Sequence, residues 1–253
     1  MKVYSVIFKE NGKNYYFNGD DLCQINDNVI VETEKGLQYG KINNIIDENN
    51  KDDNYKNIIR VANEDDTKKY YKLLKENNEA LQKCREYVNK MELNMNVISA
   101  EFTFEKEQLI YNFVSEERVD FRELAKKLAS IYHTRIELRQ IGARDKAKEI
   151  GGVGICGQKI CCQRFLNHID AISMNMAKNQ NLALNPSKIN GVCGRLLCCL
   201  EYEDENYLEC SKGLPNVGES IKTKSGDGKV VSVDILNRKC KVLVNGNKEE
   251  VDF

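Results

Sequence analysis

The sequence predicts an α+β protein, with a central helix–hairpin–helix–strand unit and a cysteine-rich segment flanked by small antiparallel β modules of the SH3-like barrel type. Three observations predict this class. Runs of β-branched and aromatic residues, separated by turn dipeptides, occupy both ends of the chain. Stretches with apolar residues at helical spacing lie between those ends. Six of the ten cysteines fall within the 44 residues from 156 to 199. We therefore divide the chain into residues 1–60, 61–145, 146–212 and 213–253.

The two ends are predicted to form the β modules. N-terminal strands are expected at Val3–Phe8, Asn14–Phe17, Val29–Thr33 and Leu37–Ile46, followed by a polar loop at Asp47–Asn54. C-terminal strands are expected at Ser220–Thr223, Lys229–Val233 and Lys239–Val244. Short strands joined by tight turns suit a small barrel, and we expect five strands in the C-terminal one.

A long helix is expected to open the central unit, from about Asp66 to Met95, with Asp66 or Thr67 as its N-cap. Six residues, alternately three and four apart, form a heptad-like seam along it: Leu74, Asn77, Leu81, Cys84, Val88 and Met91. This seam either packs on the chain's own sheet or binds a partner helix. Asn77 keeps the second interpretation open because a lone polar residue in a seam can set helix register.

The rest of the central unit is predicted to be a hairpin, a helix and a strand. Alternating apolar residues give the two hairpin strands, on either side of a turn at Glu105–Gln108. Asp120 is expected to cap the following helix, with Glu123 completing a capping box. The last strand is expected over Arg135–Ile141.

Composition and charge restrict the class of protein. No stretch approaches the roughly 18–20 apolar residues needed to cross a bilayer, and the N-terminus turns polar too soon for a signal peptide. We therefore expect a cytoplasmic protein. The overall charge of −1 conceals an uneven distribution: residues 1–117 carry a net −6, residues 118–200 a net +8 and residues 201–253 a net −3. The basic middle suits nucleic acid, an acidic partner or the negative charge of thiolate-bound metal.

The strongest signal is a repeated motif, Cys-Gly-x-x-x-Cys-Cys. Its six cysteines are Cys156, Cys161, Cys162, Cys193, Cys198 and Cys199. In a reducing cytosol, clustered cysteines more often bind metal or do redox chemistry than form disulfides. The repeat of three cysteines and a glycine at one spacing therefore indicates a thiolate metal site.

Ligand chemistry favours an iron–sulfur centre, since such clusters usually take four cysteine ligands. Adjacent cysteines usually project in different directions, so Cys156, Cys193 and one member of each adjacent pair would supply the four. Structural zinc, a redox dithiol switch and purely structural thiols remain open, although the first two more often use Cys-x-x-Cys. Cys210 is a reserve ligand. Four other residues are expected to be bystanders: Cys23, Cys84 and Cys240 in the core, and His168 beside the cysteines.

No catalytic constellation is visible, so we do not expect an enzyme. Gly152–Gly157 formally matches the dinucleotide fingerprint G-x-G-x-x-G. However, the preceding residues Arg144–Ile150 predict a helix and not the strand that this fingerprint requires. His133, at a predicted helix end, is expected to have no chemical role.

The cysteine runs and their surroundings resemble the YaaT (RicT) family, whose members carry a C-terminal domain named after a yeast polymerase-suppressor protein. The resemblance covers nearly the whole chain. It rests on Gly142–Asp145, Gly151–Gly157, Asn190–Leu196 and Leu214–Glu219, together with the strand Arg135–Ile141.

The resemblance implies a cytoplasmic regulator that joins two small helical partner proteins in a complex carrying 4Fe-4S clusters. It implies that this complex acts with the membrane-anchored endoribonuclease RNase Y in mRNA processing, and so affects sporulation, competence and biofilm formation. Carried over to this sequence, Cys156, Cys193 and Cys198 are the core cluster ligands, and Cys162 belongs to a cluster shared with partners. The alternative interpretation is a zinc-stabilised nucleic-acid-binding protein.

Overall fold

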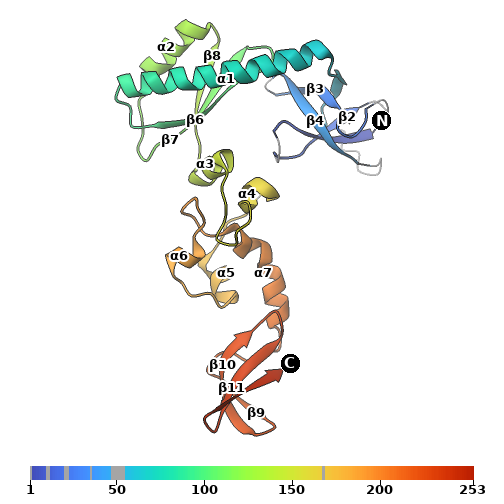
Figure 1. The fold of residues 1–253 in the computed structure, drawn as a ribbon, viewed down its shortest axis with the longest axis vertical. Coiled ribbons are helices and arrows are strands. Elements are labelled where there is room, and N and C mark those ends of the chain that lie inside the picture. The colour runs from blue at the N-terminus through green and yellow to red at the C-terminus, as the bar shows by residue number, and fades with distance from the viewer. Residues whose placement is uncertain (1, 10–11, 20–22, 35, 47–54, 167–168) are drawn as a thin grey trace. The chain divides into compact units, whose positions relative to one another are not determined.

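The computed structural model describes residues 2–9, 12–19, 23–34, 36–46, 55–166 and 169–253. The predicted loop Asp47–Asn54 lies outside them. The chain forms two compact units, Met1–Asn167 and His168–Phe253 (Figure 1). Their boundary falls between the two cysteine runs, inside segment 146–212. The division into four segments made from the sequence stays a prediction.

The N-terminal residues of the first unit form a five-stranded antiparallel sheet, which confirms the four predicted strands and adds a fifth. The strands lie in the order β2-β1-β4-β3-β5. Their bounds are β1 (Lys2–Ile7), β2 (Tyr15–Gly19), β3 (Asn28–Thr33), β4 (Gly36–Ile46) and β5 (Ile58–Val61). The long strand β4 pairs with both β1 and β3, and a bulge between Ser5 and Val6 bends the β1–β4 ladder. The core of this sheet consists of Tyr4, Val6, Phe17, Cys23, Val29, Val31 and Ile42.

The central part has the predicted helix–hairpin–helix–strand order. Its elements are α1 (Glu64–Lys90), β6 (Asn96–Phe102), β7 (Gln108–Val114), α2 (Arg122–Tyr132) and β8 (Arg135–Gln140). Strands β6 and β7 are antiparallel, and β8 adds parallel to β7. Both helices lie on one face of this sheet (Figure 1). The core between them includes Ala80, Cys84, Val88, Leu109, Tyr111, Leu124 and Leu128.

Helix α1 begins earlier than the sequence pattern predicts. Asn63 is the N-cap: its side chain accepts the Asp66 N–H at 2.8 Å, and the Asp66 carboxylate accepts the Asn63 N–H at 2.9 Å. The prediction of Asp66 or Thr67 as N-cap is therefore wrong, because Asp66 is the other half of a capping box. The prediction for α2 is wrong in the position of the N-cap, which is Phe121. The Asp120 carboxylate still accepts the backbone N–H of Arg122, the first helical residue, at 3.1 Å, and it also binds the Arg122 side chain.

The seam of α1 packs on this chain. Cys84 and Val88 are buried as expected, but Leu74 is 39% exposed and Leu73 is buried in its place. The Asn77 side chain accepts the Phe102 N–H at 2.9 Å. Because that bond occupies Asn77 within the chain, the structure favours packing on the chain's own sheet over a partner helix.

Two short helices complete the first unit, α3 (Ala143–Ile150) and α4 (Cys161–Arg164). The second unit holds α5 (Met174–Asn179), α6 (Pro186–Ile189), α7 (Cys198–Ser211), β9 (Ser220–Thr223), β10 (Gly226–Asp234), β11 (Lys239–Val244) and β12 (Asn247–Asp252). Its strands form an antiparallel sheet in the order β12-β11-β10-β9. Within the described residues this sheet has four strands where five were expected, and the SH3-like barrel form stays a prediction. None of the described helices is long and apolar enough to cross a membrane.

Candidate metal centre

The first cysteine run folds into a small hairpin between α3 and α4. Val153 and Lys159 form an isolated antiparallel bridge. The Gly154 N–H donates to the Gln158 carbonyl at 2.8 Å, and the Gly157 N–H donates to the Gly154 carbonyl at 3.0 Å. These two bonds close the turn that carries the first cysteine of the motif. We call residues 152–162 hairpin A.

The second cysteine run repeats this hairpin 37 residues later, and we call residues 189–199 hairpin B. Asn190 and Leu196 form the equivalent bridge. The Gly191 N–H donates to the Arg195 carbonyl at 2.8 Å, and the Gly194 N–H donates to the Gly191 carbonyl at 2.9 Å. The repeated sequence motif is therefore a repeated local structure.

The glycine after the first cysteine is required by backbone conformation. Gly157 has φ +76° and Gly194 has φ +73°, in the left-handed region that residues with a β-carbon occupy at a cost. A β-carbon at either position would meet no atom within 4 Å. Conformation, and not crowding, therefore accounts for glycine in both hairpins.

The hairpins present their thiols at equivalent places but with different exposure. Cys156 is exposed, Cys162 is buried, and the other four are half-buried: Cys161, Cys193, Cys198 and Cys199. The first cysteine of each run lies near the hairpin's own backbone, since a β-carbon on Gly154 would stand 3.5 Å from Cys156 Sγ. Cys161 and Cys162 differ in burial, whereas Cys198 and Cys199 are both half-buried, so the expectation that adjacent cysteines project in different directions stays a prediction.

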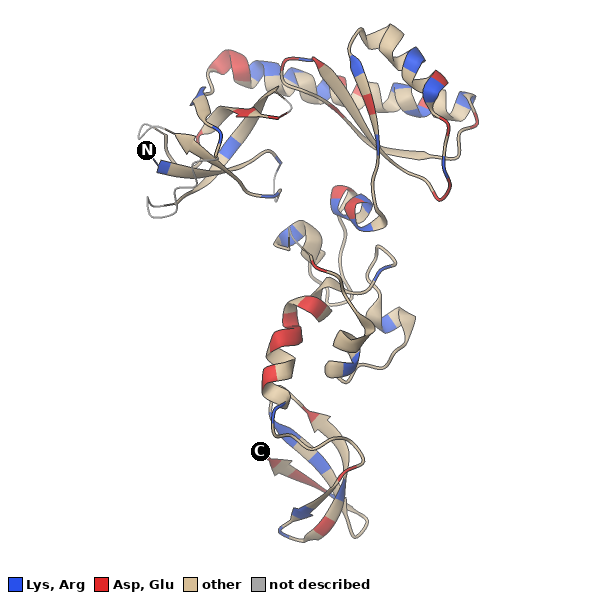
Figure 2. Ribbon diagram, turned by 180° about the vertical axis from the view of Figure 1, so that it is seen from behind, with Lys and Arg blue, Asp and Glu red and all other residues tan. Residues whose placement is uncertain are grey.

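One helix adjoining each hairpin carries an excess of one charge type. Helix α3, which leads into hairpin A, carries Arg144, Lys146 and Lys148 against two acidic residues. Helix α7, which begins with the last two cysteines of hairpin B, carries five acidic residues and no basic one (Figure 2). Positive charge close to thiolates offsets their repulsion, so hairpin A has the more favourable surroundings for a negatively charged centre.

Hairpin B rests on a small core of its own unit. Ala177, Ile189 and Leu200 are buried there, one from each of α5, α6 and α7. The buried Gln180 side chain donates to the Leu200 carbonyl at 2.8 Å. These contacts fix the start of α7, and with it the position of the adjacent cysteines.

The donor set fits a soft metal or an iron–sulfur cluster in its chemistry. Six thiols stand on two equivalent hairpins, and five of them are at least partly exposed; thiolates are the ligands that such centres take. Among the residues that the structure describes, no three His, Cys, Asp or Glu side chains form a group that could hold a metal ion. The shared four-thiolate site therefore remains a prediction.

The remaining cysteines match their expected roles where the structure tests them. Cys23, Cys84 and Cys240 are buried among core residues. Burial raises the pKa of Cys84 to about 12. Cys210 is half-buried, and its backbone carbonyl accepts a bond from Arg238. His168 lies outside the described residues.

The backbone tests one further expectation and places His133. Helix α3 precedes Gly152–Gly157, so the dinucleotide fingerprint lacks its strand, as predicted. His133 ends α2 in the left-handed conformation, with φ +50°, which gives it a structural place at the C-cap.

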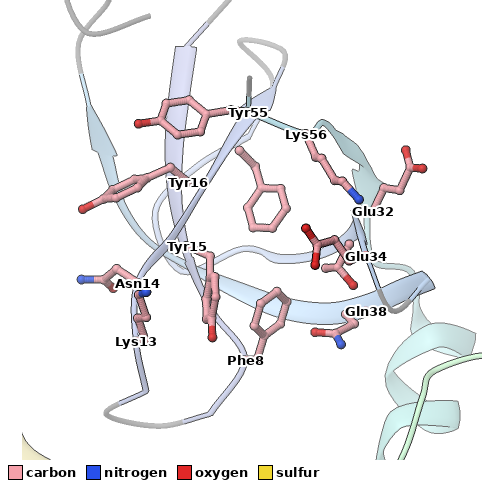
Figure 3. Close-up of a pocket in the computed structure, with 12 residues that line it drawn as sticks. Phe8, Lys13, Asn14, Tyr15, Tyr16, Glu32, Glu34, Gln38, Tyr55 and Lys56 are labelled. Carbon is pink, nitrogen blue, oxygen red and sulfur yellow. The ribbon is translucent and has the colours of Figure 1, made fainter. Parts of the chain in front are cut away.

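One feature is not anticipated by the sequence predictions. A groove on the N-terminal sheet is lined by aromatic residues, among them Tyr15, Tyr16 and Tyr55 (Figure 3). The signal that could have revealed it is the consecutive run Tyr15-Tyr16-Phe17 on a predicted strand. Successive strand residues point to opposite faces, so three large rings in a row place at least one of them outside the core.

Comparison with known proteins gives matches over most of the chain. The PSP1 C-terminal conserved region matches residues 56–141, and the third domain of PSP1-like proteins matches residues 171–214. The chain is 45% identical over 251 residues to stage 0 sporulation protein YaaT of Bacillus subtilis, covering 97% of this chain and 91% of that protein. It is 46% identical over 50 residues to protein PSP1 of Saccharomyces cerevisiae, covering 20% of this chain and 6% of that protein. No solved structure matches the chain.

Proposed function

Because this chain belongs to the YaaT family, we propose that it is a non-catalytic regulator of sporulation whose two hairpins hold a 4Fe-4S cluster. The relative that matches 97% of this chain is named for stage 0 of sporulation. The observation that carries the cluster proposal is the repeat itself. Two hairpins with the same hydrogen bonds present cysteines at the same three positions.

The proposed ligands are Cys156, Cys193 and one member of each adjacent pair. The hairpin turns hold the first cysteine of each run, and the starts of α4 and α7 hold the second ligand. The basic residues of α3 offset thiolate charge beside hairpin A. When bound, the cluster would supply a link between thiolates that responds to iron supply and to oxidation.

The proposed partners follow from the family resemblance. They are two small helical proteins of one complex, and RNase Y, whose processing of mRNA the complex directs. The protein's role there is to bind and position partners; sporulation, competence and biofilm formation respond through the processed transcripts. Four-thiolate ligation uses only one cysteine of each adjacent pair. The other cysteine of the pair would serve a cluster shared with those partners.

The test is the metal content of anaerobically purified protein, alone and with the two helical partners. Iron with matching sulfide and a broad band near about 400 nm is expected. Cys156→Ser and Cys193→Ser should each abolish iron binding if one cluster draws on both hairpins, whereas separate sites would leave about half in each variant. Cys193→Ser should also weaken partner assembly. Cys23→Ala, in the core of the N-terminal sheet, is the matched control and should retain full iron.

Full iron and sulfide in both hairpin variants would overturn the ligand assignment. Zinc without sulfide would instead favour the alternative, a zinc-stabilised nucleic-acid-binding protein. Three basic residues of the positively charged segment 118–200 already form ion pairs within the chain. Arg122, Lys126 and Arg139 each pair with a carboxylate of their own element or its immediate flank. Such pairing reduces the positive charge that these residues offer to phosphates, which is why we place this alternative second.

A further inference from the structure

Lys9 links three elements of the first unit. It stands two residues after the end of β1. Its ammonium donates to both carboxylate oxygens of Glu149 in α3, at 3.0 and 3.3 Å, and it also pairs with Glu101 of β6. One side chain beside the N-terminal sheet therefore contacts both the central sheet and the helix that leads into hairpin A.

Helix α3 has few apolar contacts to hold it in place. None of its eight residues, all of which the structure describes, is buried, and Ile150 at its end is 65% exposed. Burial of apolar surface therefore contributes little to its position, and a helix of two turns is marginal in isolation. Polar contacts such as those of Glu149 have to supply part of the restraint.

The position of α3 is passed on to hairpin A. Only Gly151 separates the last residue of the helix from the hairpin. The Ile160 N–H donates to the Gly152 carbonyl at 3.2 Å and closes the hairpin at its base. Helix α4, which follows the hairpin, packs against α3, and a β-carbon on Gly151 would stand 3.0 Å from the Gln163 side chain. A displacement of α3 would therefore carry the first cysteine run with it.

The arrangement of charges distinguishes Lys9 from an ordinary surface ion pair, which contributes little. Its ammonium lies between two carboxylates, which would repel each other in its absence. The side chains are partly covered, with Lys9 48% and Glu149 32% exposed. Burial lowers the pKa of Lys9, but Glu101 and Glu149 outweigh that effect and raise the pKa above its ordinary value. The link therefore stays charged at neutral pH.

We propose that Lys9 is a positioning residue for hairpin A: it holds α3 on the central sheet and thereby fixes where Cys156 and Cys161 stand. The inference deepens the proposed function and rests on it, because hairpin A matters here as one half of the proposed metal site. Since the link is electrostatic, salt or the loss of one charge releases it while the apolar cores stay intact.

Amide hydrogen exchange on the full chain tests this proposal. Lys9→Met keeps most of the apolar stem and removes the charge. Peptides covering α3 and hairpin A should then exchange roughly 2- to 30-fold faster, since each partly exposed pair contributes modestly and two are lost. Peptides covering hairpin B should be unchanged and serve as the internal reference. Lys9→Arg keeps the charge and should exchange much as the wild type does.

A charge swap separates electrostatic positioning from simple packing. Lys9→Glu gathers three carboxylates and should speed exchange further, whereas its combination with Glu149→Lys restores one ammonium between two carboxylates and should slow exchange again. Salt should speed exchange in the wild type more than in Lys9→Met. Lys13→Met is the matched control, because it removes a lysine of the N-terminal sheet whose ammonium lies over the Tyr15 ring, 5.7 Å from its centroid; it should change nothing in α3.

The exchange readout does not depend on iron, so the two proposals can fail separately. Unchanged exchange of α3 and hairpin A in Lys9→Met, or no recovery in the charge swap, would overturn the role of Lys9. Iron is measured in the same preparations. Wild-type protein without iron would overturn the proposed cluster, and the exchange result would still decide whether Lys9 positions the hairpin.

Discussion

Replacing Gly157 by alanine tests whether backbone conformation alone holds the first hairpin. The residue has φ +76°, and a β-carbon there would meet no atom within 4 Å. The added methyl group therefore causes no clash, and the whole cost is that of the left-handed conformation. That cost is about 1–2 kcal/mol for a residue with a β-carbon. It corresponds to a roughly 5- to 30-fold larger population of opened hairpin.

Gly154→Ala is the matched control within the same hairpin. Its β-carbon would stand 3.5 Å from Cys156 Sγ and 3.6 Å from the Gln158 carbonyl oxygen, both ordinary van der Waals distances. Gly154 is not among the positive-φ residues, so alanine there should be tolerated. Gly157→Asn should fall between the two alanine variants, because asparagine visits the left-handed region more readily than alanine.

Amide hydrogen exchange is the assay, since local opening can be measured without unfolding the chain. Peptides covering hairpin A should exchange roughly 5- to 30-fold faster in Gly157→Ala. Peptides covering hairpin B provide an internal reference in the same molecule and should be unchanged. Equal acceleration by Gly154→Ala and Gly157→Ala, or none by Gly157→Ala, would refute the conformational argument.

Three further results are expected. Native-state alkylation should modify Cys156 first and spare Cys84, whose burial raises the thiol pKa to about 12; mass spectrometry that finds Cys84 modified as fast would contradict this. The Arg60 side chain lowers the pKa of the Asp66 carboxyl. The stabilisation that this pair gives the folded protein is therefore complete above the ordinary pKa of an aspartate carboxyl and is lost as pH falls below about 4. Acid titration by circular dichroism should show a weaker pH dependence in Arg60→Ala. Gly228→Ala should lower the melting temperature of the C-terminal sheet, because its β-carbon would stand 2.5 Å from two valine side chains of β11; an unchanged melting curve would show that the strand can shift.

The local form of the site could be predicted from the sequence, but its assembly could not. Identical spacing of cysteines and glycine gives identical hydrogen bonds in hairpins A and B, because a turn is set by its own few residues. Which thiols converge on one metal depends on contacts between residues far apart in the chain. The spacing of residues within one run does not specify those contacts, so the assignment of four thiolate ligands stays a prediction.

Helix α1 shows why a helix that is correctly predicted can bury a different face from the one predicted. The spacing of residues 74 to 91 predicts a heptad seam, but Leu73 is buried and Leu74 is 39% exposed. Leu73 packs with Ile30 and Phe104 beside the N-terminal sheet, whereas Cys84 packs on the central sheet. A helix that contacts two different sheets along its length does not keep one seam. Sequence periodicity assumes a single partner surface, and that assumption fails for α1.

The two hairpins also show which properties of the site are local and which come from context. Hairpin A is followed by a four-residue helix and hairpin B by a fourteen-residue helix, yet their turn hydrogen bonds agree within 0.1 Å. The backbone geometry is therefore independent of the length of the next helix. Charge is not shared in the same way, since α4, after hairpin A, carries Arg164 and no acidic residue, whereas α7, after hairpin B, carries five acidic residues and no basic one. Because the reactivity of a thiol depends on nearby charge, we expect the cysteines of two hairpins of one shape to differ in reactivity. Exchanging the acidic residues of α7 for glutamines would alter that difference while leaving both turns intact.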